Sequence, residues 1–124
     1  TRFLMADECH IHDNYKEKLI KASDVSTMVT GKSMGDAVRC LKTPFSKKFF
    51  KMEYDPEVSR EEVLKFGTGS LRKAVFDGDN AGGSFLAGEV AGMITKRETV
   101  AQIVEDIMGG AERLLSAAPE LIAR

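Results

Sequence analysis

Residues 95–115, TKRETVAQIVEDIMGGAERLL, carry the strongest secondary-structure signal in this chain of 124 residues. Apolar side chains recur there every three or four residues, which is the spacing of one face of an α-helix. Thr95 and Glu98 have the spacing of a capping box, so the helix is predicted to begin there, and Pro119 lies beyond its predicted end. The stripe consists of Val100, Ile103, Val104, Ile107, Met108, Ala111, Leu114 and Leu115. A long amphipathic helix of this kind predicts a mainly helical chain, with residues 120–124 frayed.

Small residues fill the segment just before this helix. They recur with a period of four in two series, Gly83, Ala87, Ala91 and Ser84, Gly88, Gly92. On a helix this spacing gives a flat face that another backbone or a planar ligand can approach closely. We therefore expect a helix here, with Ser84 near its start as an N-cap. Glu89 lies within it, and two interpretations stay open: a carboxylate that bonds a ligand or transfers a proton, or a solvent-facing side chain.

Two segments farther upstream predict an antiparallel hairpin. Residues 25–30 are rich in β-branched side chains and residues 37–42 alternate in polarity, while residues 31–36 have the glycines of a turn. Shorter helices are predicted around the hairpin from local start and stop signals. The first covers residues 15–22, is capped by Asp13 or Asn14, and directs Leu19 and Ile20 inward. The second begins at Pro44 and has Phe45, Phe49 and Met52 on one face. The third runs from the Ser59–Glu62 capping box to about Phe66, and the fourth covers residues 70–76 and ends at Gly78.

The first six residues predict a strand. Phe3 and Leu4 place apolar side chains on both faces of the segment, as in a strand that is covered on both sides. Such a strand needs neighbours, and the remaining sequence offers few. We therefore expect the chain to be the carboxy-terminal piece of a larger protein; a self-sufficient domain with a trimmed end is the alternative.

The composition is that of one globular domain. Hydrophobic residues make up 43% of the chain and charged residues 30%, and 18 Lys+Arg against 19 Asp+Glu give a net charge of -1. This balance argues against a nucleic-acid or acidic-membrane partner, and no apolar run reaches the length of a membrane span. Cys9 and Cys40 have no metal-binding spacing, which favours reduced thiols and a cytoplasmic location.

Two polar clusters could carry chemistry. Residues 7–13 hold several metal-capable side chains, including His10 and His12, but they occupy one short loop with no distant partner, which favours a polar surface or pocket loop over a metal site. The second cluster interleaves lysines with phenylalanines. Its members are Lys42, Lys47, Lys48 and Lys51 with Phe45, Phe49 and Phe50. It predicts an amphipathic helix with a solvated face, and docking of an acidic partner is the other interpretation.

Four short segments go further when taken together. They are TRF at residues 1–3, NYKEK at 14–18, GSLRKAV at 69–75 and GGSFLAG at 82–88. In this order and spacing they resemble the carboxy-terminal part of the bacterial enoyl-acyl-carrier-protein reductase II family, flavoenzymes that are grouped with the nitronate monooxygenases. The resemblance runs from Thr1 to about Leu115.

The resemblance implies an α+β, mainly helical fragment of a larger oxidoreductase. The whole protein would be a TIM barrel, (β/α)8, with a smaller helical domain. Residues 1–13 would be the end of the last barrel strand and the loop after it. Residues 14–78 would form the small α+β domain, and residues 79–124 would be carboxy-terminal helices that return to the barrel.

The resemblance also implies an FMN site. Thr1, Arg2, Gly88 and Glu89 would lie at the cofactor, with the backbone at Thr1 beside the FMN phosphate. Phe3, His12 and Leu86 would line the substrate pocket. The family's catalytic-site histidine is expected upstream, so neither His10 nor His12 takes its role, and we expect no catalytic and no metal-binding residue in this chain. Family members usually have Gln where this chain has Glu89 and often His where it has Asp36, which leaves the local hydrogen bonding open.

The implied reaction passes hydride from NAD(P)H to FMN and then to the trans-2 double bond of an enoyl thioester, carried by acyl-carrier protein or coenzyme A. The implied partners are this substrate and the amino-terminal barrel, and a homodimer is possible. The 124 residues alone are expected to be inactive and to bind no FMN tightly. Two alternatives stay open: a fragment of a nitronate monooxygenase, and a stand-alone helical module whose basic face, residues 42–51, docks an acidic partner.

Overall fold

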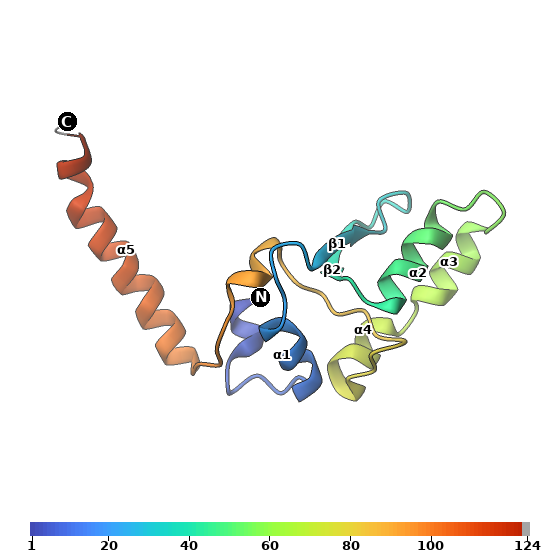
Figure 1. Cartoon of the computed structure of the whole chain (residues 1–124), viewed down its shortest axis with the longest axis horizontal. Helices are drawn as coiled ribbons and strands as arrows, with labels where there is room; N and C mark the ends of the chain where they lie inside the picture. Colours follow the sequence, from blue (N-terminus) through green and yellow to red (C-terminus); the bar gives the residue numbers. More distant parts are fainter. Residues whose placement is uncertain (123–124) are drawn as a thin grey trace.

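The computed structural model describes the backbone of residues 1–122 and the side chains of residues 1–119. It is a mixed chain of helices and one small sheet (Figure 1). Residues before 100 form a folded body, and helix α5, Val100–Ile122, extends away from it (Figure 1). None of the helices described is long and apolar enough to cross a membrane.

The predicted hairpin is confirmed. Strands β1, Thr27–Thr30, and β2, Val38–Leu41, pair antiparallel, with Thr27 opposite Leu41. Gly31 begins the connecting turn with a φ of 80°, and a Cβ there would collide with the carbonyl of Asp36. The turn therefore requires glycine at this position.

The two helices after the hairpin also begin where the sequence predicts. Helix α2, Pro44–Glu53, has proline in its first turn, and helix α3, Arg60–Gly67, follows a complete Ser59–Glu62 capping box. The rings of Phe45 and Phe66 stack with centroids 5.0 Å apart and hold the two helices together. Residues 70–76 are helical as predicted, in α4, Ser70–Arg72, and the π-helix η2, Lys73–Asp77; Gly78 ends them with a φ of 58°.

Helix α1, Asp13–Ile20, differs from the prediction in its cap and in one buried position. The N-cap is His12, whose Nδ1 accepts a hydrogen bond from the backbone N–H of Asn14, so neither Asp13 nor Asn14 caps it. Leu19 is fully buried, as expected, but Ile20 is exposed. The ring nitrogen of His12 provides the acceptor that a shorter polar side chain was expected to supply.

The helix predicted from the small residues of 83–92 is wrong. Residues 84–88 are extended and lie along β2, where Leu41 N donates to Phe85 O at 2.8 Å and Ala87 N donates to Arg39 O at 3.1 Å. Ser84 is not an N-cap; its N–H donates to the carbonyl of Ser70. The free edge of β2 needs backbone partners, and this segment provides them. Only the 3-10 helix η3, Glu89–Met93, follows.

The strand predicted at the start of the chain is also wrong. Residues Arg2–Met5 form a 3-10 helix, η1, and only Ala6 pairs like a strand residue, in a single parallel bridge with Glu98. Met5 is buried, whereas half of the Phe3 side-chain surface is exposed. The apolar pair at Phe3 and Leu4 therefore does not signal a strand covered on both faces in this structure.

Helix α5 begins later than predicted and contains Pro119. Its start is a capping box of Thr99 and Gln102, in which Thr99 N donates to Gln102 Oε1 and Gln102 N donates to Thr99 Oγ1. Glu98 cannot serve the predicted box because its carboxylate binds other side chains. The sequence predicts that residues 120–124 fray, but residues 120–122 belong to α5. Residues 123–124 lie outside the part of the chain that the structure describes.

The apolar stripe of α5 is present but uncovered. Ile103 is its only fully buried member, while Leu114 and Leu115 are each more than 70% exposed. The main core lies instead between α1, the segment at residues 84–88 and η3. It consists of Met5, Tyr15, Leu19, Leu41, Ala74, Phe85, Ala87 and Ala91.

Candidate functional site

Thr1 and Gly88, two predicted cofactor residues, are brought into direct contact. The backbone N–H of Gly88 donates to the Thr1 hydroxyl at 2.7 Å. A Cβ at position 88 would lie 3.0 Å from the same oxygen, so a larger residue would displace this contact. Gly88 is the last residue of the extended segment that pairs with β2, and this pairing positions it across from Thr1.

Tyr15 and Leu86 fix the middle of that segment. The Tyr15 hydroxyl donates to the carbonyl of Leu86 at 2.7 Å, and its ring contacts Phe85 edge-on with centroids 4.9 Å apart. Tyr15 is buried, and this burial raises its pKa to about 12. The phenol therefore stays neutral, and its hydrogen bond fixes the backbone of Leu86, a predicted pocket residue.

Lys16 and Asn14 anchor α1 to the rest of the body. Lys16 is buried and its Nζ donates to the carbonyl of Ala6 at 2.7 Å, while Asn14 Nδ2 donates to the carbonyl of Gly78. The sequence predicts a helix over these residues, with Asn14 as a candidate cap, but not the contacts that Asn14 and Lys16 make with distant backbone carbonyls. No local signal reveals them, because a lysine or asparagine next to a helix start resembles any surface residue.

Arg2 lies near the predicted site but is engaged by carboxylates. Its guanidinium forms ion pairs with Asp106 at 2.7 Å and with Glu98 at 2.8 Å. Both hydrogen-bonded carboxylates raise the pKa of Arg2, and Asp106 has the larger effect. The pKa of the Glu98 carboxyl is lowered by its bonds to Lys96 and then to Arg2. Arg2 thus joins η1 to the start of α5, and this cation is already paired.

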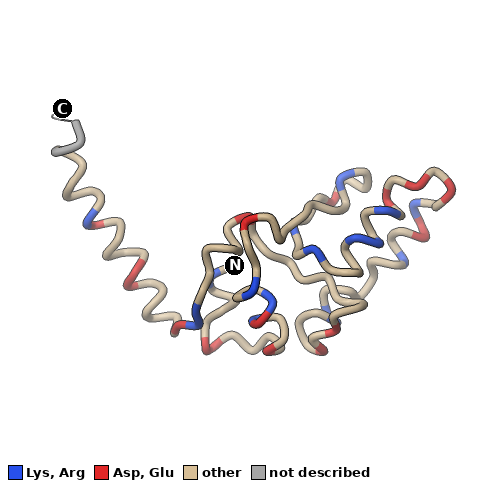
Figure 2. The backbone as a smooth tube through the Cα atoms, viewed as in Figure 1, with Lys and Arg blue, Asp and Glu red and all other residues tan. Residues whose placement is uncertain are grey.

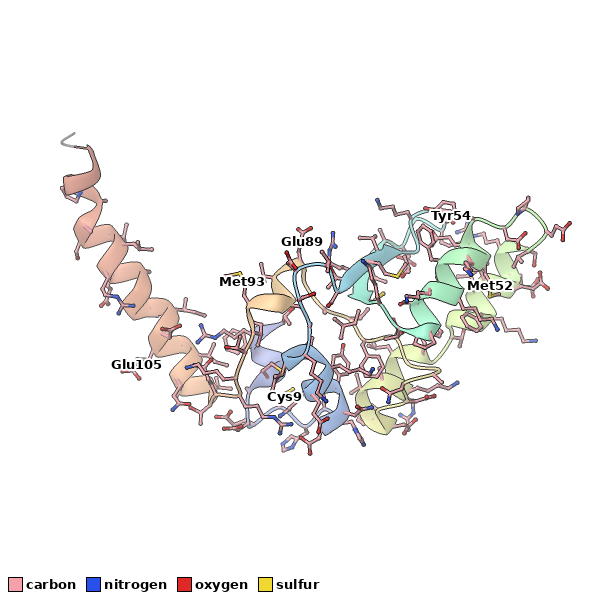
Figure 3. All side chains as sticks on the ribbon, in the orientation of Figure 1. Cys9, Met52, Tyr54, Glu89, Met93 and Glu105 are labelled. Carbon is pink, nitrogen blue, oxygen red and sulfur yellow. The ribbon has the colours of Figure 1, made fainter. Side chains whose placement is uncertain are left out.

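Glu89 faces solvent, which is one of the two interpretations that the sequence leaves open for it. Its side chain is 78% exposed, and its Oε1 lies 3.3 Å from a guanidinium nitrogen of Arg39 (Figure 3). The neighbouring Val90 and Met93 are also exposed on η3, with Met93 more than three-quarters exposed. These two apolar side chains adjoin Gly88 and were not among the predicted site residues. They border a hollow of about 500 Å³ that Arg2 also lines.

The three predicted pocket residues do not share one pocket. Leu86 lines an apolar groove of about 340 Å³ with Phe45 and Phe49. Phe3 is exposed on η1, and His12 caps α1 with its ring against Gly78. Within the described residues, no three His, Cys, Asp or Glu side chains gather as a metal site would require.

The residues present fit one side of a flavin nucleotide in part. The Thr1 hydroxyl and the Gly88 backbone, with no Cβ between them and a ligand, suit close approach of a phosphate or ribityl chain. The Glu89 carboxylate is exposed and can accept hydrogen bonds from hydroxyl or N–H groups, but it repels a phosphate. Arg2 supplies no free charge. Of the four predicted cofactor residues, Thr1 and Gly88 are thus the two whose geometry is compatible with a flavin phosphate or ribityl chain.

The chain is similar to a known protein family and to solved structures. The family model described as nitronate monooxygenase matches residues 1–110. FabK from Thermotoga maritima is 38% identical in sequence and superposes with a TM-score of 0.89, over 97% of this chain and 38% of that one. A single-residue mutant of the same protein gives 35% identity and a TM-score of 0.78, over 97% of this chain and 35% of that one.

Proposed function

The chain belongs to the nitronate monooxygenase family, and we propose that it forms the carboxy-terminal part of an FMN-dependent enoyl-acyl-carrier-protein reductase II. The observation that carries the proposal is the match to FabK, an enoyl-acyl-carrier-protein reductase II, over 97% of this chain. The chain spans 38% of the length of FabK. The activity proposed here is that of the whole protein, acting in the cytoplasm on an enoyl group carried by acyl-carrier protein or coenzyme A.

We further propose that a (β/α)8 barrel covers the surfaces that this chain leaves open. Helix α5 exposes Ile107, Leu114 and Leu115 on one face, and η3 exposes Val90 and Met93. Apolar side chains gathered in this way usually mark a surface that packs against another part of a protein. The Arg2–Asp106 and Arg2–Glu98 ion pairs hold the start of α5 against η1 and so set the direction in which that face points.

In this proposal FMN, when bound, would carry hydride from NAD(P)H to the trans-2 double bond of the enoyl thioester. The residues of this chain bind and orient. The Gly88 N–H holds the Thr1 hydroxyl, whose own proton can be donated to a ligand, at a wall that the ligand can approach closely because position 88 has no Cβ. Tyr15 stays protonated and holds Leu86 in place, and the apolar groove beside Leu86 can exclude water from an acyl chain.

A steady-state assay on the protein as its gene encodes it tests this function. Oxidation of NADH and of NADPH is followed with crotonyl thioester, and oxygen consumption is followed separately with a nitroalkane. We expect turnover with crotonyl thioester and one of the two nicotinamides, and little with the nitroalkane. Turnover of the nitroalkane without any enoyl reduction would establish the second candidate, a nitronate monooxygenase, which the family match alone also supports.

A further inference from the structure

Helix α2 carries an exposed face on which lysines alternate with aromatic rings. Lys47, Phe50 and Lys51 are spaced by three and four residues, so they lie on one side of the helix, opposite the buried Phe45, and Tyr54, the C-cap residue, places its ring against Phe50. Phe50 is 41% exposed and Tyr54, labelled in Figure 3, is 54% exposed. The centroids of their rings are 4.9 Å apart. We call these four residues the α2 face.

The charge of the α2 face is not neutralised by the protein. Among the described residues, Lys47 and Lys51 enter none of the six ion pairs, and neither does the nearby Lys42, whose Nζ binds the Val25 carbonyl. The acidic residue of the helix, Glu53, is directed elsewhere, because its carboxylate accepts from the N–H groups of Gly31 and Ser33. Figure 2 shows the basic residues along α2 and the acidic ones gathered in the loop beyond its end.

We propose that the α2 face docks the acyl-carrier protein through an acidic helix of that partner, which rests on the enoyl reductase function proposed above. Unpaired lysines around an exposed aromatic pair suit a partner helix whose carboxylates flank an apolar residue. Buried aromatic contacts provide most of the affinity of such interfaces, and the surrounding charges provide the association rate and the selection of the partner. The chain as a whole has a net charge of -1, so this attraction is local.

The position of the face agrees with such a role. Phe45 and Phe49 extend from the opposite side of α2 into the apolar groove that Leu86 also lines. A carrier protein bound on the outer side of α2 would therefore rest on the helix whose inner side borders the apolar groove proposed above for the acyl chain. Since the docking residues and the groove residues lie on opposite sides of one helix, the two can be altered separately.

Charge reversal at Lys47 and Lys51 tests the proposal in the protein as its gene encodes it. Binding of crotonyl acyl-carrier protein is measured by surface plasmon resonance for Lys47→Glu/Lys51→Glu and for two single variants, Lys51→Glu and Lys65→Glu. Lys65 is the matched control because it too is an exposed lysine in the last turn of a helix, α3, so its reversal has the same effect on the helix end. Circular dichroism confirms that each variant folds.

We expect the double variant to bind the carrier protein roughly tenfold more weakly and to lose most of its salt dependence between 50 and 300 mM NaCl, while Lys65→Glu binds as the wild type does. Unchanged binding in the double variant, no binding by the wild type, or an equal loss in Lys65→Glu would overturn the proposal. So would a change in oligomeric state with unchanged carrier binding, since the face would then join two copies of the protein.

The activity of the same variants separates this proposal from the function on which it rests. Reduction of crotonyl-N-acetylcysteamine, which lacks the carrier protein, should keep its kcat and KM in the double variant, while KM for the carrier-bound substrate rises roughly tenfold. If the wild type reduces neither thioester, the enoyl reductase function fails, and the binding data alone then decide the docking proposal.

Discussion

Replacing Tyr15 by Phe removes one hydroxyl and leaves the rest of the core in place. The Tyr15 side chain is 2% exposed, and its hydroxyl donates to the Leu86 carbonyl at 2.7 Å. The variant keeps the edge-on contact with Phe85 but leaves the partly buried Leu86 carbonyl without this donor. A hydrogen bond of this kind contributes about 0.5–1.5 kcal/mol net, so the free energy of unfolding at pH 7 should fall by about this amount.

The pH dependence of the same variant tests the burial of the phenol. The pKa of Tyr15 is about 12 in the folded protein and 10.0 for an unperturbed tyrosine. The unfolded chain therefore loses this proton first as pH rises. The stability that the neutral phenol contributes is complete below pH 10 and is lost between pH 10 and 12, by up to about 3 kcal/mol at about 1.4 kcal/mol per pH unit.

Urea unfolding of wild type and Tyr15→Phe at several pH values from 7 to 12 measures both effects. The difference between the two proteins isolates Tyr15 from the lysines that titrate in the same range. We expect the wild type to be the more stable below pH 10 and this advantage to shrink as pH rises toward 12. Equal stability at pH 7, or a difference that does not change with pH, would show that the Tyr15–Leu86 bond does not hold residues 84–88 in place.

Three further predictions test other parts of the structure. At Gly92 a Cβ would lie 2.5 Å from the backbone of the α1–β1 connection, so Gly92→Ala should lower stability by about 1–3 kcal/mol. Gly110→Ala, in α5 where there is room, should instead raise stability by about 0.5–1 kcal/mol; the same sign for both in urea unfolding would contradict the packing described. Ser59→Ala removes the cap of α3 and should lower the free energy of unfolding by about 1 kcal/mol, and an unchanged urea midpoint would show that the cap contributes nothing. Gly88→Val pushes a side chain against the Thr1 hydroxyl and should reduce the FMN that copurifies with the whole protein, as read from flavin absorbance; full flavin content would remove Gly88 from the cofactor wall.

The parts of the fold that local signals determine could be predicted from the sequence. Pro44 and the Ser59–Glu62 capping box start α2 and α3 where expected, and the glycine turn after β1 gives the hairpin. These signals act within a few residues, so no knowledge of distant partners is needed.

The errors arose where a distant partner decides the structure. Residues 84–88 have helical spacing of small side chains, but the unpaired edge of β2 draws them into an extended segment. Helix α5 begins later than predicted for a similar reason. Arg2, at the other end of the chain, binds Glu98, and Thr99 forms the cap instead. The predicted site was incomplete in the same way: the Thr1–Gly88 contact is shown, while Arg2 is paired with carboxylates and His12 is a helix cap.

The identity of the product tests the central claim most directly. The whole protein, purified with FMN, is incubated without oxygen with crotonyl thioester and NAD(P)H, and the thioester is analysed by mass spectrometry. The proposed function predicts butyryl thioester, two mass units heavier than the substrate, with one NAD(P)H consumed for each molecule formed. Unchanged crotonyl thioester from a protein that retains its flavin and that, in a separate reaction with oxygen, oxidises a nitronate would contradict it.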